Sequence, residues 1–269
     1  MKSISKPNQK GEAVLSYGGV SFFELRERPI NRLIFQLLRT CSAIGLTVLL
    51  LGCATLSERD QTAAGNSLVP WQHQHFPGKR ASEYRVVKHE GRHSLLASAE
   101  SAASMLRQTL NVPPAELSQL QFSWQVSGLI NNADMALRDS DDSPVRLVLV
   151  FEGDRSKFSM KNAMLSELAQ TMTGEPMPYA TLMYVWCNTR APGSVIINPR
   201  TDRIRKLVVE SGKGRLNQWL DYQRDIAADF EQAFGEPPGA LLGVGLMTDT
   251  DNTRSKAHAW YGPITLTKR

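Results

Sequence analysis

Cysteine is scarce in this chain of 269 residues, which contains only three. Cys41 and Cys53 lie in an N-terminal leader region, and Cys187 stands alone in the body of the chain. A disulfide within the body is therefore excluded. A folded body has to be stabilised by its hydrophobic core instead, and a hydrophobic share of 42% is ordinary for a globular domain large enough to bury one.

The leader also lacks an apolar run long enough to cross a bilayer, which takes roughly 20 residues. Its run at residues 43–52 has about 10, the length of a signal-peptide core, and follows Arg32 and Arg39. The run ends in Leu50-Leu51-Gly52-Cys53, which resembles the bacterial lipobox. We therefore predict a lipoprotein signal peptide at residues 1–52, with a long basic segment before the apolar run, and lipidation of Cys53. The alternative is an uncleaved helix in which the cysteine occurs by chance.

This resemblance also predicts a location. Ala54, rather than an aspartate, follows the cysteine, which in lipoproteins implies the outer membrane. Three acyl chains on one residue bury enough CH₂ groups for stable anchoring. The expected location is thus the periplasmic side of the bacterial outer membrane, with membrane lipid as a partner.

A strong charge of one sign is missing from the body. The chain carries a net charge of +5, but residues 1–40 hold seven basic and three acidic residues and account for four of those charges. A nearly neutral body has no field for binding phosphates. The composition therefore excludes nucleic acid as the partner.

Strand-like alternation dominates the chain after a predicted lipidated tether at residues 53–80, which is rich in Ser, Gln, Gly, Asn and Pro. The pattern predicts two helices, at residues 161–172 and 216–234. It predicts strands at residues 84–88, 94–97, 104–110, 121–126, 145–151, 180–187, 194–197, 203–210, 241–247 and 257–266. Many short strands indicate an all-β fold, an antiparallel β-sandwich spanning residues 81–269 with one or two packed helices.

Three stretches of the body resemble the bacterial DUF3047 family. They are Trp124 to Phe151, Trp219 to Gly235 and, most specifically, Gly243 to Gly262, which contains Met247-Thr248-Asp249-Thr250-Asp251-Asn252-Thr253. The similarity runs from about Phe76 to Leu266. It implies a jelly-roll, galactose-binding-like sandwich and no established activity. Arg254 departs from the family pattern, in which a glycine commonly follows Asp-Asn-Thr.

Acidic loops beside two predicted strands are the first candidate site. Asp139-Ser140-Asp141-Asp142 precedes one strand, and Asp249-Thr250-Asp251-Asn252 follows another. Such oxygens suit Ca²⁺, with Asp249 and Asp251 as its ligands, although Asp and Asn also populate turns without any ion. Arg146, inside an apolar strand, needs a carboxylate partner, for which Asp142 and Asp249 are candidates. The predicted ligand-binding residues are Asp134, Asp142, Arg146, Asp249, Asp251, Asn252 and Trp260.

Aromatic side chains on strands have two interpretations. They either form the core or stack against sugar rings from an exposed face. Trp124 shares a face with Phe122 and Val126, which favours the core, and Trp186 is similar. Trp260 and Tyr261 are adjacent, so only one of them can line a cleft. Cys187 is expected to be buried, and the five histidines receive no role.

Three functional hypotheses follow. The first is a non-catalytic binding module for glycan or a similar polar ligand, which rests on the implied fold. The second is a hydrolase of cell-envelope polysaccharide that uses a pair of carboxylates. The third is a structural or assembly partner of an envelope complex. No catalytic residue is predicted, and no cofactor other than the structural calcium.

Overall fold

A computed structural model describes residues 16–17, 20–21, 23–27 and 71–268. Cys53, the apolar leader run and most of the predicted tether lie outside the described residues. Among those described, no helix has both the length and the hydropathy that crossing a membrane requires.

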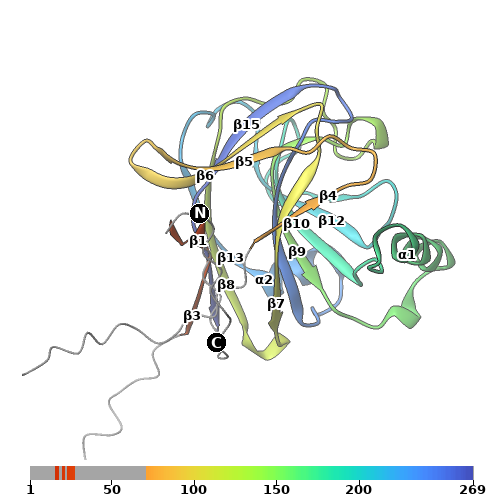
Figure 1. Ribbon diagram of the computed structural model, residues 1–269. Coiled ribbons are helices and arrows are strands. Elements are labelled where there is room, and N and C mark those ends of the chain that lie inside the picture. The colour runs from red at the N-terminus through yellow and green to blue at the C-terminus, as the bar shows by residue number, and fades with distance from the viewer. Residues whose placement is uncertain (1–15, 18–19, 22, 28–70, 269) are drawn as a thin grey trace, which may run out of the picture.

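Two β-sheets face each other, as Figure 1 shows. The first sheet contains, in spatial order, β11 (Val195–Ile197), β12 (Ile204–Ser211), β10 (Ala180–Cys187), β9 (Ser143–Phe151), β14 (Leu241–Asp249), β7 (Ser104–Val112) and β4 (Gln72–His75). The second contains β3 (Phe23–Glu27), β16 (Ile264–Lys268), β8 (Leu117–Val126), β15 (Lys256–Tyr261), β6 (Arg92–Glu100) and β5 (Glu83–His89), with β13 (Leu220–Asp225) paired to β8. The short strands β1 (Ser16–Tyr17) and β2 (Val20–Ser21) pair separately. Strands β1 to β3 lie within the predicted signal peptide at residues 1–52, so its cleavage would remove them. Single 3₁₀ turns occur at Pro114–Glu116, Arg138–Ser140 and Arg155–Lys157.

The chain passes repeatedly from one sheet to the other, as in a jelly roll. Strand β7 lies in the first sheet, β8 in the second, β9 in the first, and β13 to β15 alternate again. Most pairs are antiparallel, and the two parallel pairs are β10 with β12 and β16 with β3. The predicted jelly-roll-like antiparallel β-sandwich is confirmed.

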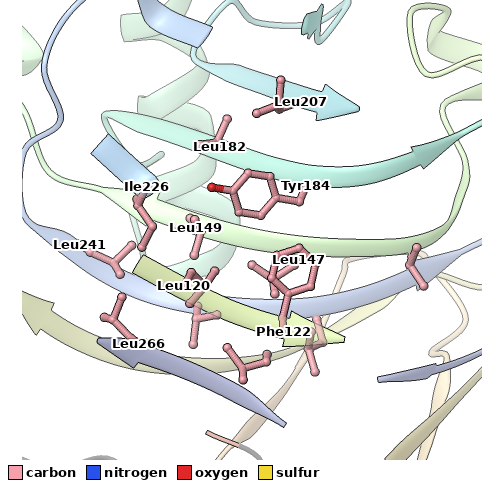
Figure 2. Packing of buried hydrophobic residues seen from close by; sticks show 14 of the residues in the cluster. Leu120, Phe122, Leu147, Leu149, Leu182, Tyr184, Leu207, Ile226, Leu241 and Leu266 are labelled. Carbon is pink, nitrogen blue, oxygen red and sulfur yellow. The ribbon is translucent and has the colours of Figure 1, made fainter. Parts of the chain in front are cut away.

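The core lies between the sheets and is built by alternation along each strand. Leu147 and Leu149 of β9 face Leu120 and Phe122 of β8, and Tyr184 of β10 stacks on Phe122 at 5.5 Å between ring centroids (Figure 2). Side chains of one strand face inward at every second position, so the residues between them face outward. Trp124 and Trp186 belong to this core, as predicted.

The predicted helix at residues 216–234 is wrong over its first half. Residues 220–225 form β13, which lies along β8 with Leu220 opposite Trp124. Helix α2 (Ile226–Phe234) begins only after Asp225, whose carboxylate accepts a hydrogen bond from the Ala228 amide at 3.1 Å. The alternation from Leu220 to Asp225 fits a strand, and pairing with β8 prevails over the weaker helical periodicity.

Two other boundaries differ from the sequence patterns. The predicted strand at residues 257–266 is two strands, β15 and β16, separated by Gly262-Pro263. Strand β4 lies inside the predicted tether and pairs with β7, so the sheet begins before residue 81. Helix α1 (Met160–Thr173) appears where a helix was predicted, outside the first sheet (Figure 1).

Candidate functional site

The predicted acidic site is a buried ionic cluster centred on Arg146. Because Leu147 faces the core, its neighbour Arg146 points to the outer side of the first sheet. Its Nε donates to Asp249 Oδ1 at 2.7 Å and its terminal nitrogen donates to Asp249 Oδ2 at 2.8 Å. The same nitrogen donates to Asp141 Oδ1 at 3.0 Å. The partner expected at Asp249 is confirmed, and Asp141, not Asp142, is the second carboxylate.

Lys206 of β12 completes this cluster from the other side. Its ammonium lies 2.6 Å from Asp141 Oδ2 and donates to the Met135 carbonyl at 2.7 Å. Met135 packs on Cys187 and Val208, so the segment that carries it covers this part of the sheet. Cys187 is buried there, as expected.

The remaining acids of the two loops are also engaged. Asp142 accepts hydrogen bonds from the backbone and side-chain amides of Asn252 and from the amide and hydroxyl of Thr253. Asp251 pairs with Lys79. The Asp142 contacts bind the loop after β14 to the loop before β9, and the Asp251 pair binds the same loop to the segment between β4 and β5.

Burial and neighbouring charge set the protonation of this cluster. Burial raises the pKa of Asp249 to about 7, and Arg146 offsets only part of that effect. Burial would also raise the pKa of Asp141, but Arg146 and Lys206 outweigh it and hold that pKa below its ordinary value. Burial and repulsion from Arg146 lower the pKa of Lys206 to about 8.

The three carboxylates Asp142, Asp249 and Asp251 approach as metal ligands would, with one oxygen of each within 4.8 Å of the others. All three already have partners within the protein: Arg146 on Asp249, Lys79 on Asp251 and amide groups on Asp142. A Ca²⁺ ion at this site would compete with two cations, Arg146 and Lys79, for these carboxylates. The three carboxylates are therefore the residue type that calcium prefers, but Arg146 and Lys79 already neutralise part of their negative charge.

Asp134 is not part of this cluster. It pairs with Arg190, and its Oδ1 also accepts a hydrogen bond from the Ala136 amide at 3.0 Å, which holds the turn of its own loop. Of the seven predicted ligand-binding residues, the structure brings five together: Asp142, Arg146, Asp249, Asp251 and Asn252. Asp134 and Trp260 lie elsewhere.

Trp260 lies on the outer face of the second sheet in an aromatic cluster, which we call the aromatic face and define as His89, Arg92, Trp219 and Trp260. The His89 and Trp260 rings stack at 4.0 Å with an angle of 7°. The Arg92 guanidinium lies 5.1 Å from the centre of a Trp219 ring. Both tryptophans are partly exposed.

Local backbone geometry creates the aromatic face. Glu90 and Gly91 both have positive φ, 49° and 81°, as a tight two-residue hairpin turn requires. That turn sets His89 directly opposite Arg92. Trp260 pairs with Gln125 on the neighbouring strand, and Trp219 immediately precedes β13 on the other side of β8.

Three buried polar atoms belong to the aromatic face or to the strands that carry or adjoin it. Ser94 Oγ, Gln125 Oε1 and Trp219 Nε1 have no hydrogen-bond partner among the described residues. The Gln125 amide nitrogen does donate, to the Glu90 carboxylate at 3.3 Å. An unpaired buried polar atom is costly, so a hydroxyl that reaches one gains a full hydrogen bond.

A shallow groove of about 450 Å³ adjoins the aromatic face. Arg92 and Asp221 form a bidentate pair at its side, at 2.8 and 3.3 Å. The outward side chains along it carry amides, hydroxyls and one carboxylate: Gln121, Ser123, Asp221, Gln223 and Thr265. The amides and hydroxyls can both donate and accept hydrogen bonds, and the carboxylate accepts them.

Sequence reasoning missed His89, Arg92 and Trp219 as site residues. Gly91, between the strands predicted at residues 84–88 and 94–97, is the local signal for a tight hairpin turn, and such a turn sets His89 opposite Arg92 on one face. Their meeting with Trp260 and Trp219 depends on strand order, which no local pattern carries.

Comparison with known proteins finds one matching family and several solved structures of low similarity. Residues 69–265 match the family described as "Protein of unknown function (DUF3047)". No curated protein matches the chain in sequence. The xyloglucanase domain of NopAA from Sinorhizobium fredii is 9% identical with a TM-score of 0.39, over 74% of this chain and 93% of that one.

Two further solved structures have similar statistics. The family 11 carbohydrate-binding module of the Clostridium thermocellum cellulase Lic26A-Cel5E is 7% identical with a TM-score of 0.36, over 74% of this chain and 88% of that one. Endoglucanase cel12A from Rhodothermus marinus is 10% identical with a TM-score of 0.39, over 74% and 97%. The family match covers most of the described sandwich, and the chain therefore belongs to the DUF3047 family.

Proposed function

We propose that this protein is a non-catalytic binding module that holds a glycan of the cell envelope on its aromatic face. The observation that carries the proposal is the stacked His89–Trp260 pair beside a groove lined by amides and hydroxyls. Sugar rings present apolar C–H faces and a rim of hydroxyls. An aromatic surface next to convergent polar groups matches both parts of such a ligand.

The charge of the groove favours binding over hydrolysis. Glycoside hydrolysis needs two carboxyl groups that flank the scissile bond. Asp221 is the single acid among the described residues that line the groove, and Arg92 pairs with it. The other paired acids, Asp142 and Asp249, are almost completely buried in the ionic cluster.

The same proposal includes a cellular location, the periplasmic side of the outer membrane. The lipobox-like Leu50-Leu51-Gly52-Cys53 supports lipid attachment at Cys53. Ala54 supports the outer membrane over the inner one. A module held there meets envelope glycan on its periplasmic side.

The test is glycan binding by the full-length protein and two variants, Trp260→Ala and His89→Ala. An array of neutral oligosaccharides, peptidoglycan fragments and lipopolysaccharide cores identifies a ligand, and titration calorimetry then gives its affinity. We expect each variant to weaken binding about tenfold, or ~1.4 kcal/mol, as for an aromatic anchor in an interface.

Leu137→Ala is the matched control, because Leu137 is also an exposed apolar side chain but belongs to the loop over the first sheet. It should bind like the wild type. An array on which no glycan is retained, or an affinity that Trp260→Ala leaves unchanged, contradicts the proposal. Pull-down of an envelope protein by the same face would favour the assembly hypothesis instead.

A further inference from the structure

Helix α1 presents an apolar ridge to solvent. Met160, Met164, Leu168 and Met172 follow one another at intervals of four residues, and their exposed fractions are 82%, 67%, 54% and 58%. Residues four apart in a helix lie above one another on one side. These four are most of the large exposed hydrophobic side chains among the residues that the structure describes.

The rest of α1 is also poorly covered. Asn162 is its one buried residue, held by a hydrogen bond to Asp202 at 2.6 Å and one from the Thr201 hydroxyl at 2.7 Å. An isolated helix of this length is marginal in water, and most protein helices are stabilised by a buried apolar face. Only Lys161 and Glu167 of its 14 residues are charged. The ridge is therefore apolar enough to be buried, yet nothing among the described residues covers it.

Helix α1 lies close to the point where the predicted lipidated tether joins the sandwich. A groove of about 300 Å³ joins the C-terminal end of α1, at Met172 and Thr173, to strand β4 at Gln72. Strand β4 is where the chain enters the sandwich after the predicted lipid-bearing Cys53. The 18 residue-to-residue steps from Cys53 to Trp71 span at most about 60 Å when fully extended.

We propose that the ridge of Met160, Met164, Leu168 and Met172 lies in the interface of the membrane that carries the lipid anchor. Methionine side chains are flexible and polarizable, and they adapt to an irregular apolar surface. Three methionines and one leucine bind a membrane weakly alone, but a tether raises the effective concentration of the membrane, so weak contact suffices. The contact orients the sandwich on the membrane and rests on the lipid attachment proposed above.

The experiment reports the surroundings of single positions on α1 in the lipidated protein, in which cleavage before Cys53 has removed Cys41. The Met164→Cys variant is labelled with a polarity-sensitive fluorophore. Cys187 is buried and the Cys53 sulfur carries lipid, so neither competes for the label. The protein is then reconstituted in vesicles of phosphatidylethanolamine and phosphatidylglycerol.

We expect the emission at position 164 to shift to the blue and its quenching by iodide to fall severalfold when vesicles are present. Gln170→Cys is the control, because Gln170 is exposed on the opposite side of α1. It should stay open to iodide under both conditions.

Two results overturn the ridge contact. One is an iodide-accessible position 164 in protein whose mass shows the lipid on Cys53. The other is protection at position 164 without vesicles that grows with protein concentration, since it shows that a second copy covers the ridge. If the measured mass shows no lipid on Cys53, the proposed lipid attachment is wrong. The ridge contact, which rests on that attachment, is then wrong as well.

Discussion

Arg146 is the residue on which the ionic cluster depends. Its side chain is 3% exposed, and its guanidinium pairs with two carboxylates, Asp249 and Asp141. Burial would lower the pKa of Arg146, but these carboxylates outweigh that effect and raise it above its ordinary value. Removal of the cation leaves buried charge without compensation.

Arg146→Met should therefore lower the free energy of unfolding by about 3–5 kcal/mol, the usual loss when one partner of a buried ion pair is removed. Urea unfolding of the variant and wild type measures the difference. Arg107→Met is the matched control, because Arg107 forms an exposed pair with Glu175 and should change stability by about 0–1 kcal/mol. Equal losses in the two variants would contradict the role given to burial.

Asp249 should make stability depend on pH near neutrality. Its pKa is about 7 in the folded protein, whereas an aspartate free of such surroundings has a pKa of 3.8, so the folded state binds the proton more tightly. Stability linked to Asp249 is then complete below pH 3.8 and declines as the pH rises towards 7. Subtracting the unfolding free energies of Asp249→Asn from those of the wild type, between about pH 4.5 and 8, isolates this contribution.

The expected difference falls with rising pH and levels off above about pH 7. A difference that grows with pH would show that Arg146 holds Asp249 ionised, with a pKa below 3.8. The sign of the slope is therefore the decisive observation.

Among the elements, helix α2 is stabilised by the residue that caps its N-terminus. Asp225 ends β13 and caps α2 through the Ala228 amide. Asp225→Ala should lower the unfolding free energy by about 1 kcal/mol, because one helix amide loses its partner and a favourable charge leaves the helix N-terminus. Thermal unfolding measures the loss, and Asp221→Ala, in an exposed position of β13, is the control. An unchanged melting temperature for Asp225→Ala would contradict the capping role.

The strands were predictable from sequence because their alternation is local. The prediction at Val145 to Phe151 matches β9 to within two residues, whereas that at Gln121 to Val126 covers only the second part of β8, which begins at Leu117. The core positions of Trp124 and Trp186 were predicted correctly. The helix predicted from Leu216 failed over β13, because the free edge of β8 selected a strand there. Partners across the sheets, such as His89 on Trp260 and Asp141 on Arg146, needed the strand order, which local periodicity does not contain.

For the whole molecule, the effect of calcium on the melting temperature shows whether the ionic cluster needs a metal ion. Lys79, Arg146 and Lys206 already neutralise most of the charge of Asp141, Asp142, Asp249 and Asp251. We expect neither millimolar Ca²⁺ nor EDTA to change the melting temperature of the full-length protein. A rise with Ca²⁺ that Asp251→Asn abolishes would establish a metal site and reverse this expectation.

The two outermost strands of the first sheet are short. Strand β11 has three residues and β4 has four, whereas the strands between them have eight or nine. An outer strand offers its unpaired amide and carbonyl groups to other chains, and brief edges leave few such groups for intermolecular pairing. Even at a high local concentration, copies of this sandwich therefore have little edge on the first sheet through which to join into larger sheets.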